Sequence, residues 1–140
     1  MNIIVLMGPY RCGKTTTLNN VYDLLLTQGA VSAGKKPIAD NDFSDIVTLK
    51  GKKIAIYTLG DYAKRLIENA ANYANQNCDI MICACNKRFV TPFKVFKEMG
   101  MTTIVDKIKE KDRLLREKAD INKARIIVDL IQTSGEKAAF

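Results

Sequence analysis

The feature that most constrains the fold is a glycine-rich segment that joins a strand-like run to a helical run. Residues 8–15 read Gly-Pro-Tyr-Arg-Cys-Gly-Lys-Thr. The preceding residues 2–7 are short and apolar, as in a buried strand, and residues 16–28 show helical periodicity up to Gly29. Glycine permits backbone conformations and close approaches that a Cβ atom forbids. The pattern therefore predicts a strand, a tight loop and a helix in direct succession.

This segment, called the glycine loop below, has the form G-x-x-x-x-G-K-T, which is suited to binding phosphate. Its backbone N–H groups can converge on phosphate oxygens, reinforced by the positive end of the following helix dipole. Lys14 is expected to reach the outer phosphates, and the Thr15 hydroxyl to bind Mg²⁺. The alternative is a chance match to a strand, turn and helix. The predicted phosphate-binding residues are Gly8, Pro9, Tyr10, Arg11, Cys12, Gly13, Lys14, Thr15 and Thr16.

Length and composition indicate a single soluble domain over residues 1–140. Hydrophobic residues make up 47% of the chain and charged residues 26%, which is ordinary for a globular protein. No apolar run approaches the roughly 20 residues that a membrane span needs. The first apolar run lacks a preceding basic region and leads into the glycine loop, so we expect neither a signal peptide nor a membrane partner.

The four cysteines do not have the spacing of a zinc site or of a secreted disulfide framework. Cys83 and Cys85 are expected to share one face of a strand as small buried thiols. The thiolate of Cys12 would be favoured by the loop N–H groups and Lys14, which predicts sensitivity to alkylation. Together these features fit a reducing cytoplasm.

The chain has a formal net charge of +7, from 22 Lys and Arg against 15 Asp and Glu. Nucleic acid is one possible partner for such a charge. Polyphosphate is a simpler explanation for part of it, because Arg11 and Lys14 lie in the loop itself. The sequence shows no stripe of alternating aromatic and basic residues of the kind that binds single strands.

The remaining elements are expected to alternate as in α/β proteins. Residues 30–44 form a long polar connection, called the 30–44 segment below, which we expect to be functional or mobile. Two strands over residues 45–50 and 52–58 are expected to pair as a hairpin around Gly51. Further strands are expected at 78–84 and 101–105, and further helices at 61–77, from Pro92 to Gly100, and at 108–133, with Asp61 as an N-cap.

With this loop and element order, the chain resembles the P-loop nucleoside triphosphate hydrolase superfamily over essentially its whole length. The resemblance rests on one specific motif and on the order of the elements. It implies a three-layer α/β/α core with a mostly parallel, five-stranded sheet and an antiparallel hairpin strand at one edge. The loop strand would lie in the middle of this sheet, with nucleotide across the carboxyl ends of the strands.

A comparison with small GTPases argues for ATP over GTP. Residues 57–60 (Tyr-Thr-Leu-Gly) and 86–89 (Asn-Lys-Arg-Phe) are similar in place to the D-x-x-G and N-K-x-D motifs. Tyr57 and Phe89 stand where those motifs have aspartate. The carboxylate that would pair with guanine is therefore missing, and each such charged hydrogen bond is worth about 1.5–3 kcal/mol.

The chain also looks similar to small P-loop kinases and ATPases, although no lid is visible. Asp61 would lie past the carboxyl end of the strand beside the loop strand, where it can bind Mg²⁺ or orient a nucleophile. Helix capping is its alternative role. Asp40 and Asp42 are expected to be solvated loop acids. Lys107 and Lys109 are candidates to contact nucleotide, with a solvated basic helix face as the favoured alternative.

The sequence thus favours an enzyme that uses ATP and Mg²⁺, either for hydrolysis or for phosphoryl transfer to an unidentified small acceptor. Lys14 and Asp61 are the predicted catalytic residues, and Thr15 and Asp61 the predicted metal ligands. The alternative is a non-catalytic or slowly hydrolysing switch whose 30–44 segment changes order with the bound phosphate and whose final helix meets a protein partner. A nucleic-acid-associated ATPase is supported only by the net charge.

Overall fold

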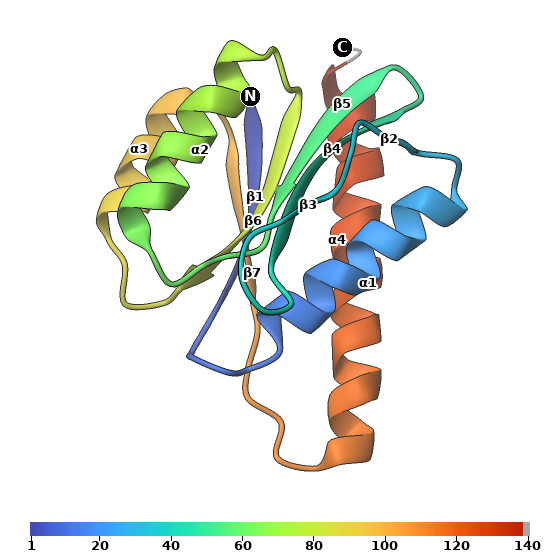
Figure 1. Cartoon of the computed structure of the whole chain (residues 1–140), viewed down its shortest axis with the longest axis vertical. Coiled ribbons are helices and arrows are strands. Elements are labelled where there is room, and N and C mark those ends of the chain that lie inside the picture. The colour runs from blue at the N-terminus through green and yellow to red at the C-terminus, as the bar shows by residue number, and fades with distance from the viewer. Residues whose placement is uncertain (139–140) are drawn as a thin grey trace.

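The computed structural model combines strands and helices and describes residues 1–138, with the side chains up to Thr133 (Figure 1). The elements are β1 (Asn2–Gly8), α1 (Lys14–Thr27), β2 (Val31–Ser32), β3 (Lys36–Pro37), β4 (Phe43–Leu49), β5 (Lys52–Tyr57), α2 (Ala63–Asn75), β6 (Ile80–Asn86), α3 (Thr91–Met99), β7 (Thr102–Asp106) and α4 (Arg113–Ala138). No described helix combines the length and apolar character that crossing a membrane requires.

The strands form one mixed sheet of seven strands in the order β2-β4-β5-β6-β1-β7, with β3 also paired to β4. Strands β5, β6, β1 and β7 run parallel, whereas β4 is antiparallel to β2, β3 and β5. The expected five-stranded sheet was therefore too small, because the 30–44 segment adds β2 and β3 at the edge. We expected the strand before Asp61, which is β5, to lie beside β1. This was also wrong, because β6 lies between β5 and β1.

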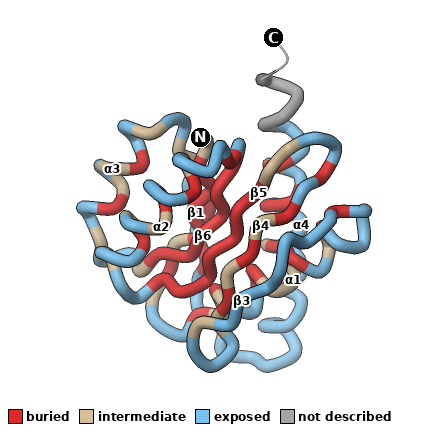
Figure 2. The backbone as a smooth tube through the Cα atoms, turned by 45° about the horizontal axis from the view of Figure 1, so that its top comes forward, coloured by how far each residue is buried: buried red, intermediate tan, exposed pale blue. Residues whose placement is uncertain are grey.

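The helices cover both faces of the sheet and give three layers. Helices α1 and α4 pack on one face, and α2 and α3 on the other (Figure 1). Alternate residues of β1 point to opposite faces, so that Ile4 and Leu6 pack under α1 and α4 while Ile3 and Val5 pack under α2 and α3. Figure 2 shows the central strands almost entirely buried.

The cysteines of β6 confirm this alternation. Cys83 and Cys85 both lie in the cluster under α2 and α3, as their spacing predicted, and both are fully buried. Burial raises the pKa of the Cys83 thiol, and raises that of Cys85 to about 11 despite the opposing charge of Lys14. These thiols therefore act as small apolar core residues.

The predicted hairpin is present and has a tight turn. Lys50 and Gly51 connect β4 to β5, with φ angles of 50° and 79°, and Leu49 pairs with Lys52. Two successive residues with positive φ are typical of the type I′ turn, whose twist matches that of the paired strands. This turn sets the register that brings the first residues of β4 beside the last residues of β5.

The 30–44 segment is held against the body of the protein by a buried carboxylate. Asp45 is 4% exposed and accepts hydrogen bonds from Tyr22 Oη at 2.8 Å, from Ser32 Oγ and from Gly34 N at 3.1 Å. Burial raises the pKa of Tyr22. The segment is thus anchored at β2, while its far end carries Asp40 and Asp42.

The final helix begins later than expected. It starts at Arg113, where Asp112 Oδ1 accepts hydrogen bonds from the backbone N–H groups of Leu114 and Leu115 at 2.9 and 3.2 Å. Residues 107–112 therefore form a connection instead of the first turns of a helix. This connection brings Lys107 beside the glycine loop.

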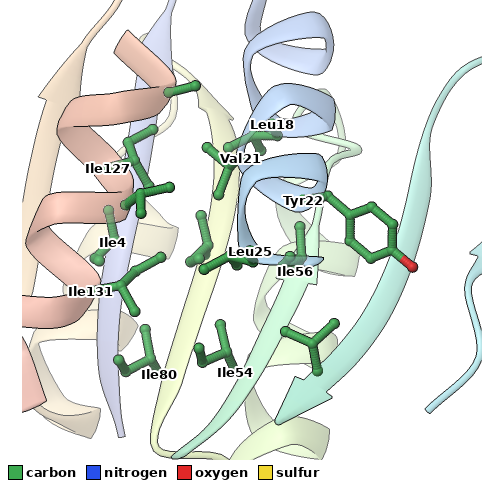
Figure 3. Packing of buried hydrophobic residues seen from close by; sticks show 14 of the residues in the cluster. Ile4, Leu18, Val21, Tyr22, Leu25, Ile54, Ile56, Ile80, Ile127 and Ile131 are labelled. Atoms are coloured by element: carbon green, nitrogen blue, oxygen red, sulfur yellow. The ribbon is translucent and has the colours of Figure 1, made fainter. Parts of the chain in front are cut away.

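Packing of α4 on the sheet provides a test of the core. Ile127 is fully buried among residues of α1 and β1 (Figure 3). Its neighbour Ile126 is 47% exposed. We expect Ile127→Ala to lower the free energy of unfolding by about 2–5 kcal/mol, because it removes buried methyl groups and leaves a cavity. The matched variant Ile126→Ala should change it by less than about 1 kcal/mol. Urea denaturation measures both, and equal losses would contradict this packing.

Candidate functional site

The glycine loop connects β1 to α1 and contains two residues with positive φ. Arg11 has φ 58° and Gly13 has φ 98°, and Gly13 is the residue before the first turn of α1. A Cβ atom on Gly13 would lie 2.7 Å from Asp120 Oδ1, and one on Gly8 would lie 2.5 Å from Lys107 O. Both glycines are therefore required by close contact with residues that follow β7 or belong to α4.

Lys14 lies across the loop and not in solvent. Its side chain is buried, and Nζ donates hydrogen bonds to Gly8 O at 2.9 Å and to Pro9 O at 2.8 Å. Carbonyl oxygens thus stabilise the buried ammonium group, which lines a pocket in front of the loop.

The pocket in front of the glycine loop, called the loop pocket below, has a volume of about 330 Å³. It lies at the carboxyl ends of parallel strands, between α1, the start of β4 and α4. Its lining includes the predicted residues Tyr10, Arg11, Gly13, Lys14, Thr15, Thr16 and Asp61, and in addition Asp42, Thr58, Gly60, Arg116 and Asp120.

Asp42 is the acidic residue that contacts Thr15. Asp42 Oδ1 accepts hydrogen bonds from Thr15 Oγ1 at 2.9 Å and from Thr58 Oγ1 at 2.8 Å. Thr58 is itself buried and accepts a hydrogen bond from Phe43 N at 2.9 Å. The expectation that Asp42 is a solvated loop acid was therefore wrong. Three oxygen atoms meet here, and oxygen is the ligand type that Mg²⁺ prefers.

Asp61 lies at the rim of the loop pocket and is exposed. Its strand is separated from β1 by β6, which removes the adjacency on which its predicted role rested. It is also not a helix cap, because α2 begins at Ala63 with Tyr62 in the N-cap position and has no side-chain capping bond. Asp61 does line the pocket, so it stays a candidate for binding a ligand there.

A buried ion pair lies beneath the loop. Lys107 Nζ is 2.8 Å from Asp120 Oδ1, and the two side chains are only 2% and 5% exposed. The backbone N–H of Lys107 donates to Met7 O at 2.7 Å, and Thr17 Oγ1 donates to Asp120 Oδ1 at 3.4 Å. The pair therefore joins β7, α4, β1 and α1 directly behind Gly13.

Both alternatives for Lys107 were thus wrong, because it neither faces the pocket nor belongs to a solvated helix face. Lys109 is exposed and is absent from the lining of the loop pocket. The basic residue that α4 does contribute to the pocket is Arg116. Its guanidinium donates to Glu110 O at 3.1 Å and to Lys111 O at 3.3 Å, which holds it near the start of the helix.

The structure also corrects the expectation for Cys12. This residue is 1% exposed, with its sulfur 4.0 Å from Lys14 Nζ. Burial prevents access by reagents, so the predicted sensitivity to alkylation does not follow.

Tyr57 and Phe89, the residues in place of the GTPase aspartates, pack in or against the cluster under α2 and α3.

Comparison with protein-family models, with curated proteins and with solved structures found no match. The function of the chain is therefore inferred from the geometry of the site.

The buried ion pair can be tested by removing one partner. We expect Lys107→Met to lower the free energy of unfolding by about 3–5 kcal/mol, because Asp120 would stay buried without its cation. The double variant Lys107→Met/Asp120→Leu should regain most of this loss. Lys109→Met, in the same connection but exposed, is the matched control. A single variant as stable as the control in guanidinium denaturation would contradict the assigned role.

Proposed function

We propose that this chain binds ATP with Mg²⁺ in the loop pocket and either hydrolyses it or transfers its γ-phosphoryl group to a small acceptor. The observation that carries the proposal is the position of Lys14, whose ammonium group is held inside the glycine loop by Gly8 O and Pro9 O at the carboxyl end of β1. The resemblance of the loop to P-loop proteins, in motif and in flanking elements, supports the same conclusion.

Phosphate binding is supported by the start of α1. This helix has neither an acidic residue in its first turn nor a side-chain cap. The first N–H groups of a helix lack intrahelical acceptors and carry the positive end of its dipole. Phosphate oxygens would satisfy the N–H groups of Lys14, Thr15 and Thr16, with Lys14 Nζ exchanging loop carbonyls for the outer phosphates.

Thr15 and Asp42 would hold the metal ion. The Thr15 hydroxyl and the Asp42 carboxylate are already in hydrogen-bond contact at 2.9 Å, and Thr58 adds a third oxygen next to them. This set fits Mg²⁺, which takes few protein ligands and keeps several waters. When bound, Mg²⁺ would neutralise charge on the phosphate oxygens. Asp42 thereby takes the first place among the metal ligands, ahead of Asp61.

Positive charge for the reaction is available on two sides of the loop pocket. Arg11 lies in the glycine loop, and Arg116 comes from α4. Phosphoryl transfer depends mainly on positioning and on charges aimed at the transferring group. Asp61, at the rim, would orient the attacking oxygen.

A nucleotide-dependent switch is the second candidate, favoured by the contact between Thr15 and Asp42. Asp42 lies near the end of the 30–44 segment, whose start is anchored by the hydrogen bond from Gly34 to Asp45. A metal ion that enters between Thr15 and Asp42 would replace their direct hydrogen bond. The segment would then adopt different positions with and without nucleotide, which is how a binding module signals its state.

Removing Lys14 tests the central proposal. We expect Lys14→Ala to weaken ATP binding about 10- to 150-fold, the equivalent of one lost charged hydrogen bond. Lys94→Ala, on the exposed side of α3, is the control. Isothermal titration with ATP and with GTP in the presence of Mg²⁺ measures both affinity and base preference. Unchanged ATP affinity in Lys14→Ala would end the proposal, and equal affinity for GTP would contradict the preference for adenine.

Paired carboxamide variants test the metal ligand. Asp42→Asn should weaken the dependence of ATP binding and phosphate release on Mg²⁺, because an amide oxygen is uncharged. Asp61→Asn should change this dependence less. Both are measured by titrating Mg²⁺ at fixed ATP, followed by the release of inorganic phosphate. A loss confined to Asp61→Asn would instead support Asp61 as the metal ligand.

A further inference from the structure

A second hollow, called the side pocket below, adjoins the loop pocket and has a volume of about 560 Å³. It is formed where the connections that follow β1, β5 and β6 meet, at the carboxyl ends of these strands. Tyr10 and Asp61 line both pockets. The lining residues are Pro9, Tyr10, Asp61, Tyr62, Asn86, Lys87 and Arg88.

Backbone hydrogen bonds tie these connections together. Asn86 N donates to Gly60 O at 3.1 Å, and Lys87 N donates to Gly8 O at 3.4 Å. Asn86 Oδ1 accepts from Arg88 N at 3.1 Å, which turns the chain at the end of β6. The side pocket is therefore a fixed part of the fold, and its basic residues are attached to the same strand ends as the glycine loop.

Two exposed aromatic rings lie in this pocket. Tyr10 is 60% exposed and Tyr62 is 56% exposed, although tyrosine usually buries most of its ring. An arginine guanidinium group lies over each ring. Arg11 Cζ is 5.1 Å from the centre of the Tyr10 ring, and Arg65 Cζ is 5.1 Å from the centre of the Tyr62 ring. Such rings offer flat apolar surfaces to a planar ligand, next to cations that attract negative charge.

The charges of the side pocket are mostly positive. Lys87 and Arg88 are exposed, and Asp61 is the single acidic residue among those that line it. An anionic ligand would therefore meet Lys87 and Arg88, and Asp61 would lie at its end nearest the loop pocket. The combination of flat apolar surface and cations was invisible in the sequence, because it is assembled from three separate connections.

We propose that the side pocket binds a nucleotide unit, with the base stacked on Tyr62 and the phosphate held by Lys87 and Arg88. The unit can be a free nucleotide or part of a single strand, since both present the same base and phosphate. Its position beside the loop pocket makes it the acceptor site, a role that rests on the proposed function. Binding itself does not depend on that function.

The test uses the full chain and two probes, thymidine 5′-monophosphate and a 5′-phosphorylated hexamer of deoxythymidine. Each is titrated in the presence of a non-hydrolysable ATP analogue and, separately, in the Lys14→Ala background, so that the loop pocket does not capture the probe. We expect at least one probe to bind in both conditions. Binding of the monophosphate identifies a free nucleotide as the ligand, whereas binding of the hexamer alone identifies a strand.

Substitutions distinguish stacking from charge. Tyr62→Leu should weaken binding about 5- to 100-fold and Tyr62→Phe should retain it, because every base stacks on an aromatic face. Arg88→Ala should weaken binding and reduce its dependence on salt, whereas Arg125→Ala, an exposed arginine on α4, should change neither.

Two results would overturn the proposal. One is that neither probe binds, and the other is that the unmodified protein and the Tyr62→Leu variant bind the probe with equal affinity. Failure of ATP to bind in the separate titration would overturn the proposed function alone. If probe binding depends on Tyr62, the proposal for the side pocket is supported whether or not ATP binds in that titration.

Discussion

The buried pair of Lys107 and Asp120 is the interaction on which the site depends. Two charges have been removed from water there, and such a pair persists only where geometry and further hydrogen bonds compensate the loss of hydration. Here the compensation comes from a 2.8 Å contact and from Thr17. Because Asp120 lies close behind Gly13, the pair connects α4, the end of β7 and the glycine loop. The shape of the loop is therefore set from behind, by residues more than ninety positions further along the chain.

The front of the site depends on the hairpin instead. The turn at Lys50 and Gly51 sets the pairing of β4 with β5, and this pairing brings Asp42 to Thr58. Thr15 reaches the same carboxylate from α1. One acid thus connects a helix, the end of a central strand and the 30–44 segment. The Asp45 side chain anchors the start of that segment through Ser32 and Gly34.

Much of the fold could be predicted because its signals are local. The glycine loop, the apolar alternation of β1 and β6 and the hairpin turn all lie in short stretches of sequence. Strand order was not accessible, since nothing local shows that β6 inserts between β5 and β1. For that reason the strand that precedes Asp61 was wrongly placed beside β1. Asp42 was missed because it lies before the predicted hairpin strand, which began at residue 45, and only the folded chain brings it to Thr58. The role of Lys107 was misjudged because its partner Asp120 lies thirteen positions further along the chain and charged residues usually face solvent.

Tyr10 and Asp61 form a wall common to the loop pocket and the side pocket. Two ligands on opposite sides of such a wall cannot be energetically independent if either one shifts it. By thermodynamic linkage, the factor by which the first ligand changes affinity for the second equals the factor in the other direction. Tyr10 is an exposed loop residue that lines both pockets, so either occupant can contact it. The glycine loop would then serve as a sensor of its neighbour as well as a cradle for its own ligand.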